Sequence, residues 1–109
     1  MIPYGKHYID QEDINAVIKV LKSDNLTQGS LIAVFEKEIS KYVGAKYSVV
    51  VTSCTAGLHL ASIVAKMNKG KVLLTSPITF VATANSSLFC GAETIFADID
   101  SSTINISTD

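Results

Sequence analysis

Small hydroxyl residues interrupt an apolar run at residues 52–55, and the chain then resumes as an apolar helical pattern. When a buried strand ends in such a turn, the unpaired N–H groups of the next helix point back at the turn, where the helix dipole adds about half a positive charge. Ser53 and Thr55 supply hydroxyl groups beside those amides. The pattern predicts a phosphate cradle. Ser and Thr are also ordinary N-cap residues, so the residues alone leave both interpretations open.

The composition limits how this chain can hold an anion. The glycine spacing and the lysine of a Walker loop or a dinucleotide fingerprint are absent around the turn. All nine basic residues are Lys, so no Arg can form a bidentate clamp on a phosphate or a carboxylate. An anion bound by these residues must therefore rely on backbone amides, hydroxyl groups or a lysine.

Bulk properties describe a small globular segment. With 109 residues, of which 48% are hydrophobic and 17% charged, the chain suffices for one domain at most. A formal net charge of −1 gives no electrostatic case for a nucleic acid or an anionic membrane as partner. Cys54 and Cys90 show neither metal spacing nor a disulfide framework, and no apolar run approaches the roughly 20 residues that cross a bilayer. We therefore expect free thiols, no metal site and a cytoplasmic location.

The turn is expected to lie within an alternating series of helices and strands. An extended arm precedes two amphipathic helices, at 11–22 and, capped by Ser30, at 31–43. The polar loop at 23–29 between them has the composition of a plain connector or of a binding loop. Further along, the sequence predicts strands at 46–51, 71–75 and 93–99 and helices at 55–66 and 79–89. The order indicates an α/β fold with parallel strands, and the small number of strands predicts the front part of something larger.

Several ordered blocks of the sequence identify a family together, although each alone is weak. These blocks are residues 3–6, 26–29, 35–36, 42–45, 53–60, 76–85 and 98–100. They resemble the amino-terminal part of the DegT-type sugar-nucleotide aminotransferases, which are pyridoxal-phosphate (PLP) enzymes of the aspartate aminotransferase fold. The likeness is strongest to members that act in pseudaminic acid synthesis, where an amino group is placed on C4 of a UDP-linked 4-keto-6-deoxy sugar. The implied fold is α/β, the amino-terminal part of the large domain of a fold-type I PLP-dependent transferase, with an incomplete sheet.

The resemblance implies a cofactor site. The phosphate-side turn of the family maps on Cys54, Thr55 and Ala56, whose backbone amides, with the Thr hydroxyl, are expected to hold the phosphate of pyridoxal 5′-phosphate. The ring-stacking aromatic maps on Phe80, for which core packing is the alternative. At position 54 the family often has Gly or Ala, so the thiol of this chain departs from the pattern; an amide contact survives that change.

The resemblance also implies substrate contacts from the arm and from the loop after the first helix. These map on Tyr4 in the arm and on the loop residues Asp24, Asn25, Leu26 and Thr27. They are expected to contact the UDP-sugar, and glutamate is the expected amino donor. A homodimer is expected for the full-length protein.

The catalytic residues of the family are expected outside this chain. Its Schiff-base lysine and its pyridine-pairing Asp lie well beyond residue 109, so residues 1–109 are expected to be a partial large domain, with the arm and helices at 1–45 and the start of the sheet at 46–109. Such a fragment is predicted to be inactive. The lysines Lys66, Lys69 and Lys71 are interpreted as surface residues. His59 is expected to make a hydrogen bond in the core or between helices rather than to catalyse. Asp98 and Asp100, at a strand end, are expected to serve a turn or a sheet edge.

The same likeness predicts an unpartnered strand. In the family the second and third of these strands are neighbours, whereas the first pairs with a strand from later in the chain, so the run at 46–51 lacks its partner and the isolated segment is expected to be marginally stable or self-associating. Three other classes stay open: a complete small α/β domain that binds a phosphate or nucleotide without chemistry, a non-catalytic regulatory relative that lacks the lysine, and an interaction fragment whose Ser and Thr are only caps.

Overall fold

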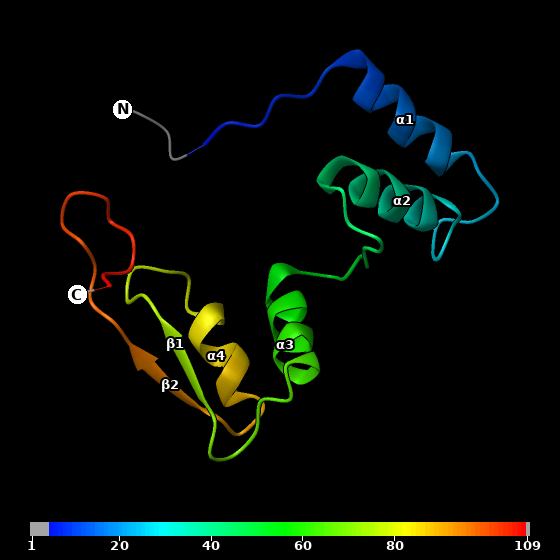
Figure 1. The fold of residues 1–109 in the computed structure, drawn as a ribbon. Helices are drawn as coiled ribbons and strands as arrows, with labels where there is room; N and C mark the ends of the chain where they lie inside the picture. The colour runs from blue at the N-terminus through cyan, green and yellow to red at the C-terminus, as the bar shows by residue number, and fades with distance from the viewer. Residues whose placement is uncertain (1–4, 109) are drawn as a thin grey trace. The chain divides into compact units, whose positions relative to one another are not determined.

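The computed structural model describes residues 5–108, and the chain divides into two units, Met1–Val50 and Val51–Asp109. The first unit contains α1 (Gln11–Leu21) and α2 (Leu31–Val43) (Figure 1). The second contains α3 (Cys54–Val64), β1 (Val72–Thr75), α4 (Ala82–Leu88) and β2 (Glu93–Phe96). None of the helices among the described residues is long and apolar enough to cross a membrane.

The helices of the first unit begin differently. The Asp10 carboxylate accepts the N–H groups of Glu12 (2.9 Å) and Asp13 (3.1 Å), while the Asp13 carboxylate accepts the Asp10 N–H (3.1 Å), so α1 starts with a reciprocal capping box. The predicted side-chain cap of α2 was wrong: Ser30 occupies the cap position but makes no cap hydrogen bond and has helical backbone angles. The end was predicted correctly, because Gly44 takes the left-handed conformation (φ 68°) that terminates α2.

The second unit is a βαβ arrangement with α3 packed beside α4. β1 and β2 are parallel neighbours, with Leu73 opposite Thr94 and Leu74 opposite Ile95, which confirms the predicted pairing of these two strands. α4 connects the strands and contacts both of them as well as α3 (Figure 1). The buried hydrophobic residues are Ala82 and Ala92, so the helices approach the sheet through small side chains.

Residues 46–51 do not form the predicted strand. The sheet contains only β1 and β2 among the described residues, and Tyr47 and Val49 each remain 75% exposed instead of buried. Polar atoms of the run bond to α2: the Val50 N–H donates to the Glu36 carboxylate (2.9 Å), and the Ser48 hydroxyl donates to the Glu36 carbonyl. A strand is stable only when a neighbour completes its hydrogen-bond ladder. A β-branched run without such a neighbour therefore stays irregular.

Candidate functional site

The start of α3 is organised by Ser53. This residue has extended backbone angles at the cap position, and its side-chain oxygen accepts the N–H of Ala56 at 3.1 Å. The N–H of Gly57 donates to the Ser53 carbonyl, also at 3.1 Å. Ser53 thus performs the N-cap function that the sequence left open as an alternative, and it engages two of the first four amides of the helix.

The amides at this turn that lack an intrahelical acceptor include those of Cys54 and Thr55. Both are exposed and occupy the first two helical positions, where no intrahelical acceptor exists for their N–H groups. The exposed Thr55 hydroxyl and the positive end of an 11-residue helix complete the donor set. Two amides, one hydroxyl and a helix N-terminus form the chemistry that a phosphate monoester requires. Ala56, the third residue assigned to the cup by resemblance, is half-buried and its amide is already bonded to Ser53.

Phe80 lies in the segment between β1 and α4. This segment and the start of α3 are at the same end of the second unit, the upper end in Figure 1. Phe80 is 74% exposed, so it is not packed into a core by the residues that the structure describes. Its carbonyl accepts the N–H of Thr83 (3.0 Å), which fixes the backbone as it enters α4. An aromatic ring thus stands exposed at the end of the unit that also carries the amides of Cys54 and Thr55.

The predicted substrate loop lies in the first unit. A cavity of about 710 Å³ opens between the end of α1 and the beginning of α2, and Asp24, Asn25 and Leu26 contribute to its lining. Thr27 belongs to the same loop but does not line the cavity. A Cβ on Gly29 would stand 3.1 Å from the Asn25 carbonyl oxygen, so the loop folds closely over this glycine. Tyr4 lies outside the described residues.

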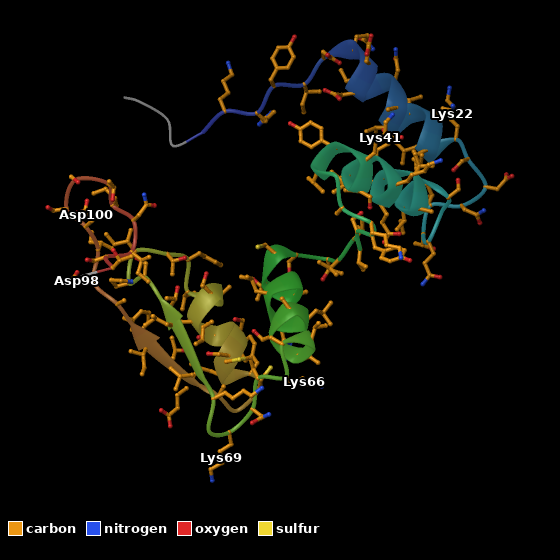
Figure 2. All side chains as sticks on the ribbon, viewed as in Figure 1. Lys22, Lys41, Lys66, Lys69, Asp98 and Asp100 are labelled. Atoms are coloured by element: carbon orange, nitrogen blue, oxygen red, sulfur yellow. The ribbon has the colours of Figure 1, made fainter. Side chains whose placement is uncertain are left out.

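The lysines near the turn occupy the other end of α3. Figure 2 shows Lys66 and Lys69 at the lower end of the second unit, away from the start of α3. The Lys71 ammonium group donates to the Lys66 carbonyl at 2.6 Å and so serves the C-terminal end of this helix, where a cation is favourable. This placement agrees with the interpretation of all three as surface residues.

His59 contacts the end of α4 through its ring and not through the predicted hydrogen bond. Its ring meets the Phe89 ring edge-on, with 5.4 Å between the centroids. Phe89 directly follows α4, so the contact ties α3 to the end of that helix. The interaction is an aromatic one rather than a hydrogen bond.

Asp98 and Asp100 organise the loop that follows β2, as their labels show in Figure 2. The Asp100 carboxylate accepts hydrogen bonds from the hydroxyls and amides of Ser102 and Thr103, and the two hydroxyls and the Thr103 amide lie within 3.0 Å. These bonds, with the Ser102 hydroxyl foremost, lower the pKa of Asp100 from 3.8 to about 2. The Asp98 side chain accepts the Ile99 N–H (2.8 Å). The turn alternative is confirmed for Asp100, whose carboxylate bonds to the two residues that follow in the loop.

Two polar arrangements were not predicted from the sequence. One is the pair of hydrogen bonds that the Ser48 hydroxyl and the Val50 N–H donate to Glu36 of α2. The other joins Ser87 of α4 to Thr94 of β2 through their hydroxyl oxygens, 2.6 Å apart. In the described part of the chain, no group of three or more acidic, His or Cys side chains is arranged to hold a metal ion.

Comparison with known proteins defines the class to which this site belongs. The chain matches the DegT/DnrJ/EryC1/StrS aminotransferase family over residues 7–109, and it belongs to that family. Its fold is α/β with a small open sheet, and the solved structures that it resembles are aminotransferases.

Three relatives show the extent of the likeness. The chain is 44% identical to the spore coat polysaccharide biosynthesis protein SpsC of Bacillus subtilis, over 96% of this chain and 27% of SpsC. It is also 44% identical to the UDP-4-amino-4,6-dideoxy-N-acetyl-beta-L-altrosamine transaminase of Campylobacter jejuni, over 91% of this chain and 26% of that enzyme. Spr1654 from Streptococcus pneumoniae, assigned as a sugar aminotransferase and solved in PMP and PLP forms, superposes with a TM-score of 0.89 at 25% identity, over 97% of this chain and 27% of that one. The chain therefore spans about a quarter of the length of these relatives.

Proposed function

We propose that this chain is part of a PLP-dependent sugar-nucleotide aminotransferase that transfers an amino group from glutamate to C4 of a UDP-linked 4-keto-6-deoxy sugar. The observation that carries the proposal is family membership across residues 7–109, together with the 44% identity to a transaminase named for a UDP-4-amino-4,6-dideoxy sugar. Because the chain spans about a quarter of such relatives, the activity is proposed for the whole protein.

Within this chain, the turn at the start of α3 binds the cofactor phosphate. The amides of Cys54 and Thr55 and the Thr55 hydroxyl donate to the phosphate oxygens, and Ala56 closes the same turn. Phe80 stacks on the pyridine ring. When bound, pyridoxal phosphate supplies the electron sink that amino-group transfer needs. The exposed donors of the turn, and an exposed Phe80 at the same end of the unit, support these roles.

The residues that bind the UDP-sugar are proposed to lie in the first unit and in the arm that precedes α1. Asp24, Asn25, Leu26 and Thr27, with Tyr4, contact the UDP-sugar. The cavity beside the first three of these residues supports the assignment of the loop to binding rather than to a plain connection. Its volume of about 710 Å³ lies in the range of small-molecule sites.

The remaining catalytic groups are proposed to lie outside residues 1–109, in a protein that acts as a cytoplasmic homodimer. Residues 1–109 then form part of the large domain, with the arm and helices at 1–45 and the start of the sheet at 46–109. The placement of Lys66, Lys69 and Lys71 at the opposite end of α3 from the turn supports their interpretation as surface residues rather than as the Schiff-base lysine.

The proposal is tested by comparing the complete gene product with the polypeptide of residues 1–109. Each is incubated with pyridoxal phosphate, glutamate and a UDP-linked 4-keto-6-deoxy sugar, and the amino sugar is detected by mass spectrometry. We expect product only from the complete protein, and borohydride reduction is expected to fix the cofactor to one lysine of that protein alone. A complete protein that binds the cofactor without forming product would instead be the non-catalytic relative. Turnover by residues 1–109 would refute the placement of the lysine.

A further inference from the structure

We propose that Glu36 blocks one edge of residues 46–51 against β-pairing with a second copy of this chain. This role is independent of the proposed enzyme activity. The carboxylate protects the chain from self-association through a run that has the composition of a strand and, among the described residues, no neighbouring strand.

Residues 46–51 carry backbone groups that are available for pairing. The run contains three consecutive valines, a residue type that favours strands. Tyr47 and Val49 are each 75% exposed. In the described part of the chain, the Val50 N–H is the only backbone N–H or C=O group of this run that makes a hydrogen bond. Such a stretch is a template for strand pairing between chains.

Glu36 holds this run against α2 at two points. Its carboxylate accepts the Val50 N–H at 2.9 Å, and its main-chain carbonyl accepts the Ser48 hydroxyl. The bonded residues are 14 and 12 positions apart in the sequence, so these bonds are tertiary contacts rather than local turns. Glu36 and Ser48 are both half-buried, which agrees with a contact between the two segments.

The alternation of a strand determines which edge Glu36 occupies. In an extended segment, the N–H groups of successive residues point to opposite edges. The amides of Ser48 and Val50 then belong to one edge, and those of Val49 and Val51 belong to the other. Glu36 occupies the first, which we call the Val50 edge, and leaves the second open.

A second copy of the chain meets two obstacles at the Val50 edge. Its strand must displace the Glu36 carboxylate from the Val50 N–H, and a symmetric pairing also brings the Glu36 carboxylates of both copies to the same interface. Like charges that face each other across paired strands are destabilising. Glu36 therefore opposes pairing both as a hydrogen-bond acceptor and as a charge, as charged side chains at strand edges do in general.

Hydrogen exchange of the valine amides in the full chain distinguishes the two edges. Protein labelled with ¹⁵N-valine reports Val50 on the blocked edge and Val49 and Val51 on the open one, and exchange is measured over a range of protein concentrations. In the unmodified chain we expect the protection of Val50 to be the same at all concentrations, because its partner is intramolecular. Protection that grows with concentration should appear only at Val49 and Val51.

Glu36→Ala removes the blocking carboxylate. We expect Val50 exchange to become roughly two- to tenfold faster at low concentration, the factor that corresponds to one hydrogen bond. At high concentration the protection of Val50 is expected to return, because its edge is then free to pair. Light scattering should detect larger species than the unmodified chain forms, since two open edges permit continued growth.

Two further variants separate the hydrogen bond from the charge. Glu36→Gln keeps an acceptor oxygen without the charge, so it is expected to retain the protection of Val50 at low concentration and to associate more than the unmodified chain. Glu38→Ala removes the same charge from an exposed position of α2 and is expected to behave as the unmodified chain.

Three results would overturn the role of Glu36. Protection of Val50 that rises with concentration in the unmodified chain would show that the Val50 edge is open. Unchanged Val50 exchange in Glu36→Ala would show that the carboxylate does not hold this amide. Equal association of Glu36→Ala and Glu38→Ala would assign the effect to net charge. If Glu36→Ala does not fold, the concentration series of the unmodified chain and of Glu36→Gln still decides whether the edge is blocked.

Discussion

Two neighbouring hydroxyl residues, Ser53 and Thr55, have different roles because they occupy different positions relative to the helix. The sequence indicates the residue types and the turn, but it does not determine the residue at which α3 begins, and a helix that began two residues later would be capped by Thr55 instead of Ser53. Only the backbone, extended at Ser53 and helical from Cys54, settles the assignment. The turn at residues 52–55 was therefore predictable from the sequence, whereas the identity of the residue that caps α3 was not.

Replacing Thr55 by Val tests the hydroxyl at this turn, since the two side chains have nearly the same shape. We expect the affinity for pyridoxal phosphate to fall about 10- to 100-fold, because a hydrogen bond to a charged group contributes about 1.5–3 kcal/mol. Cofactor fluorescence gives the dissociation constant. Thr52→Val, at an exposed position before the helix, is the matched control and should bind normally. Equal affinities for the two variants would remove Thr55 from the cup.

Replacing Phe80 by Ala distinguishes ring stacking from packing. The side chain is 74% exposed, so its truncation should change the free energy of unfolding by less than about 0.5 kcal/mol. Loss of a stacked aromatic partner should weaken cofactor binding roughly two- to tenfold. Urea denaturation and cofactor titration measure the two quantities separately. A large loss of stability with unchanged affinity would favour the packing alternative.

At the scale of elements, the helices were easier to predict than the strands. The capping box around Asp10 and the terminal Gly44 act through bonds within a few residues, so local sequence is sufficient for α1 and for the end of α2. A strand depends on a partner that the local sequence does not describe. The run at 46–51 has strand composition throughout yet bonds to Glu36 of α2, because no partner for it lies among the described residues.

At the contact between α4 and β2, the hydroxyl groups of Ser87 and Thr94 form a hydrogen-bonded pair. Ser87 is fully buried, its hydroxyl oxygen is 2.6 Å from that of Thr94, and both hydroxyls lie 3.0 Å from the Ala84 carbonyl. The Ser87 and Thr94 hydroxyls have one hydrogen each for three oxygen–oxygen contacts, so one of these contacts lacks a hydrogen at any moment. We expect Thr94→Val to cost about 1–3 kcal/mol of stability, since it leaves Ser87 with fewer partners. Urea denaturation measures the loss, and Thr83→Val, on the half-buried side of α4, serves as a comparison. A neutral Thr94→Val would show that the pair contributes nothing.

The loop after β2 should respond to acid through Asp100. Its pKa in the folded chain, about 2, lies below the ordinary 3.8 because Ser102 and Thr103 donate to the ionised carboxylate. A lowered pKa means that the ionised form stabilises the loop: the contribution is present above the ordinary pKa and is lost as the pH falls toward 2. We expect the Ser102 and Thr103 amides to lose protection from hydrogen exchange over this interval. Asp100→Ala, which removes the acceptor oxygen, should show the unprotected rates at all pH values. A pH-independent wild type would contradict the assignment.

At the scale of the whole molecule, the α/β class and the order of the elements other than the strand at 46–51 were predictable from the periodicity of the sequence, whereas the pairing of β1 with β2 followed from the family resemblance. The extent of burial was not predictable. The apolar stripes that define α1 and α2 predict a core, yet Ile14, Val17 and Phe35 are each more than 40% exposed. An amphipathic pattern indicates which face of a helix is suited to burial. It does not indicate which other segment packs against that face.

The exposed apolar surface leads to a prediction about residues 1–109 as an isolated polypeptide. Ala82 and Ala92 are its only buried hydrophobic residues among those described, and Val72, Leu74 and Ile95 of the sheet stand about half exposed. Such a core buries little apolar surface to offset the loss of chain entropy on folding, so we expect a free energy of unfolding below about 5 kcal/mol or association into larger species.

Light scattering across a range of concentrations measures the association, and a denaturant melt at each concentration measures the stability. Association should be weakened by Leu74→Lys on the exposed face and unaffected by Val64→Lys at the exposed end of α3. A sharp, concentration-independent melt of a monomer would show instead that these few elements suffice for a stable domain.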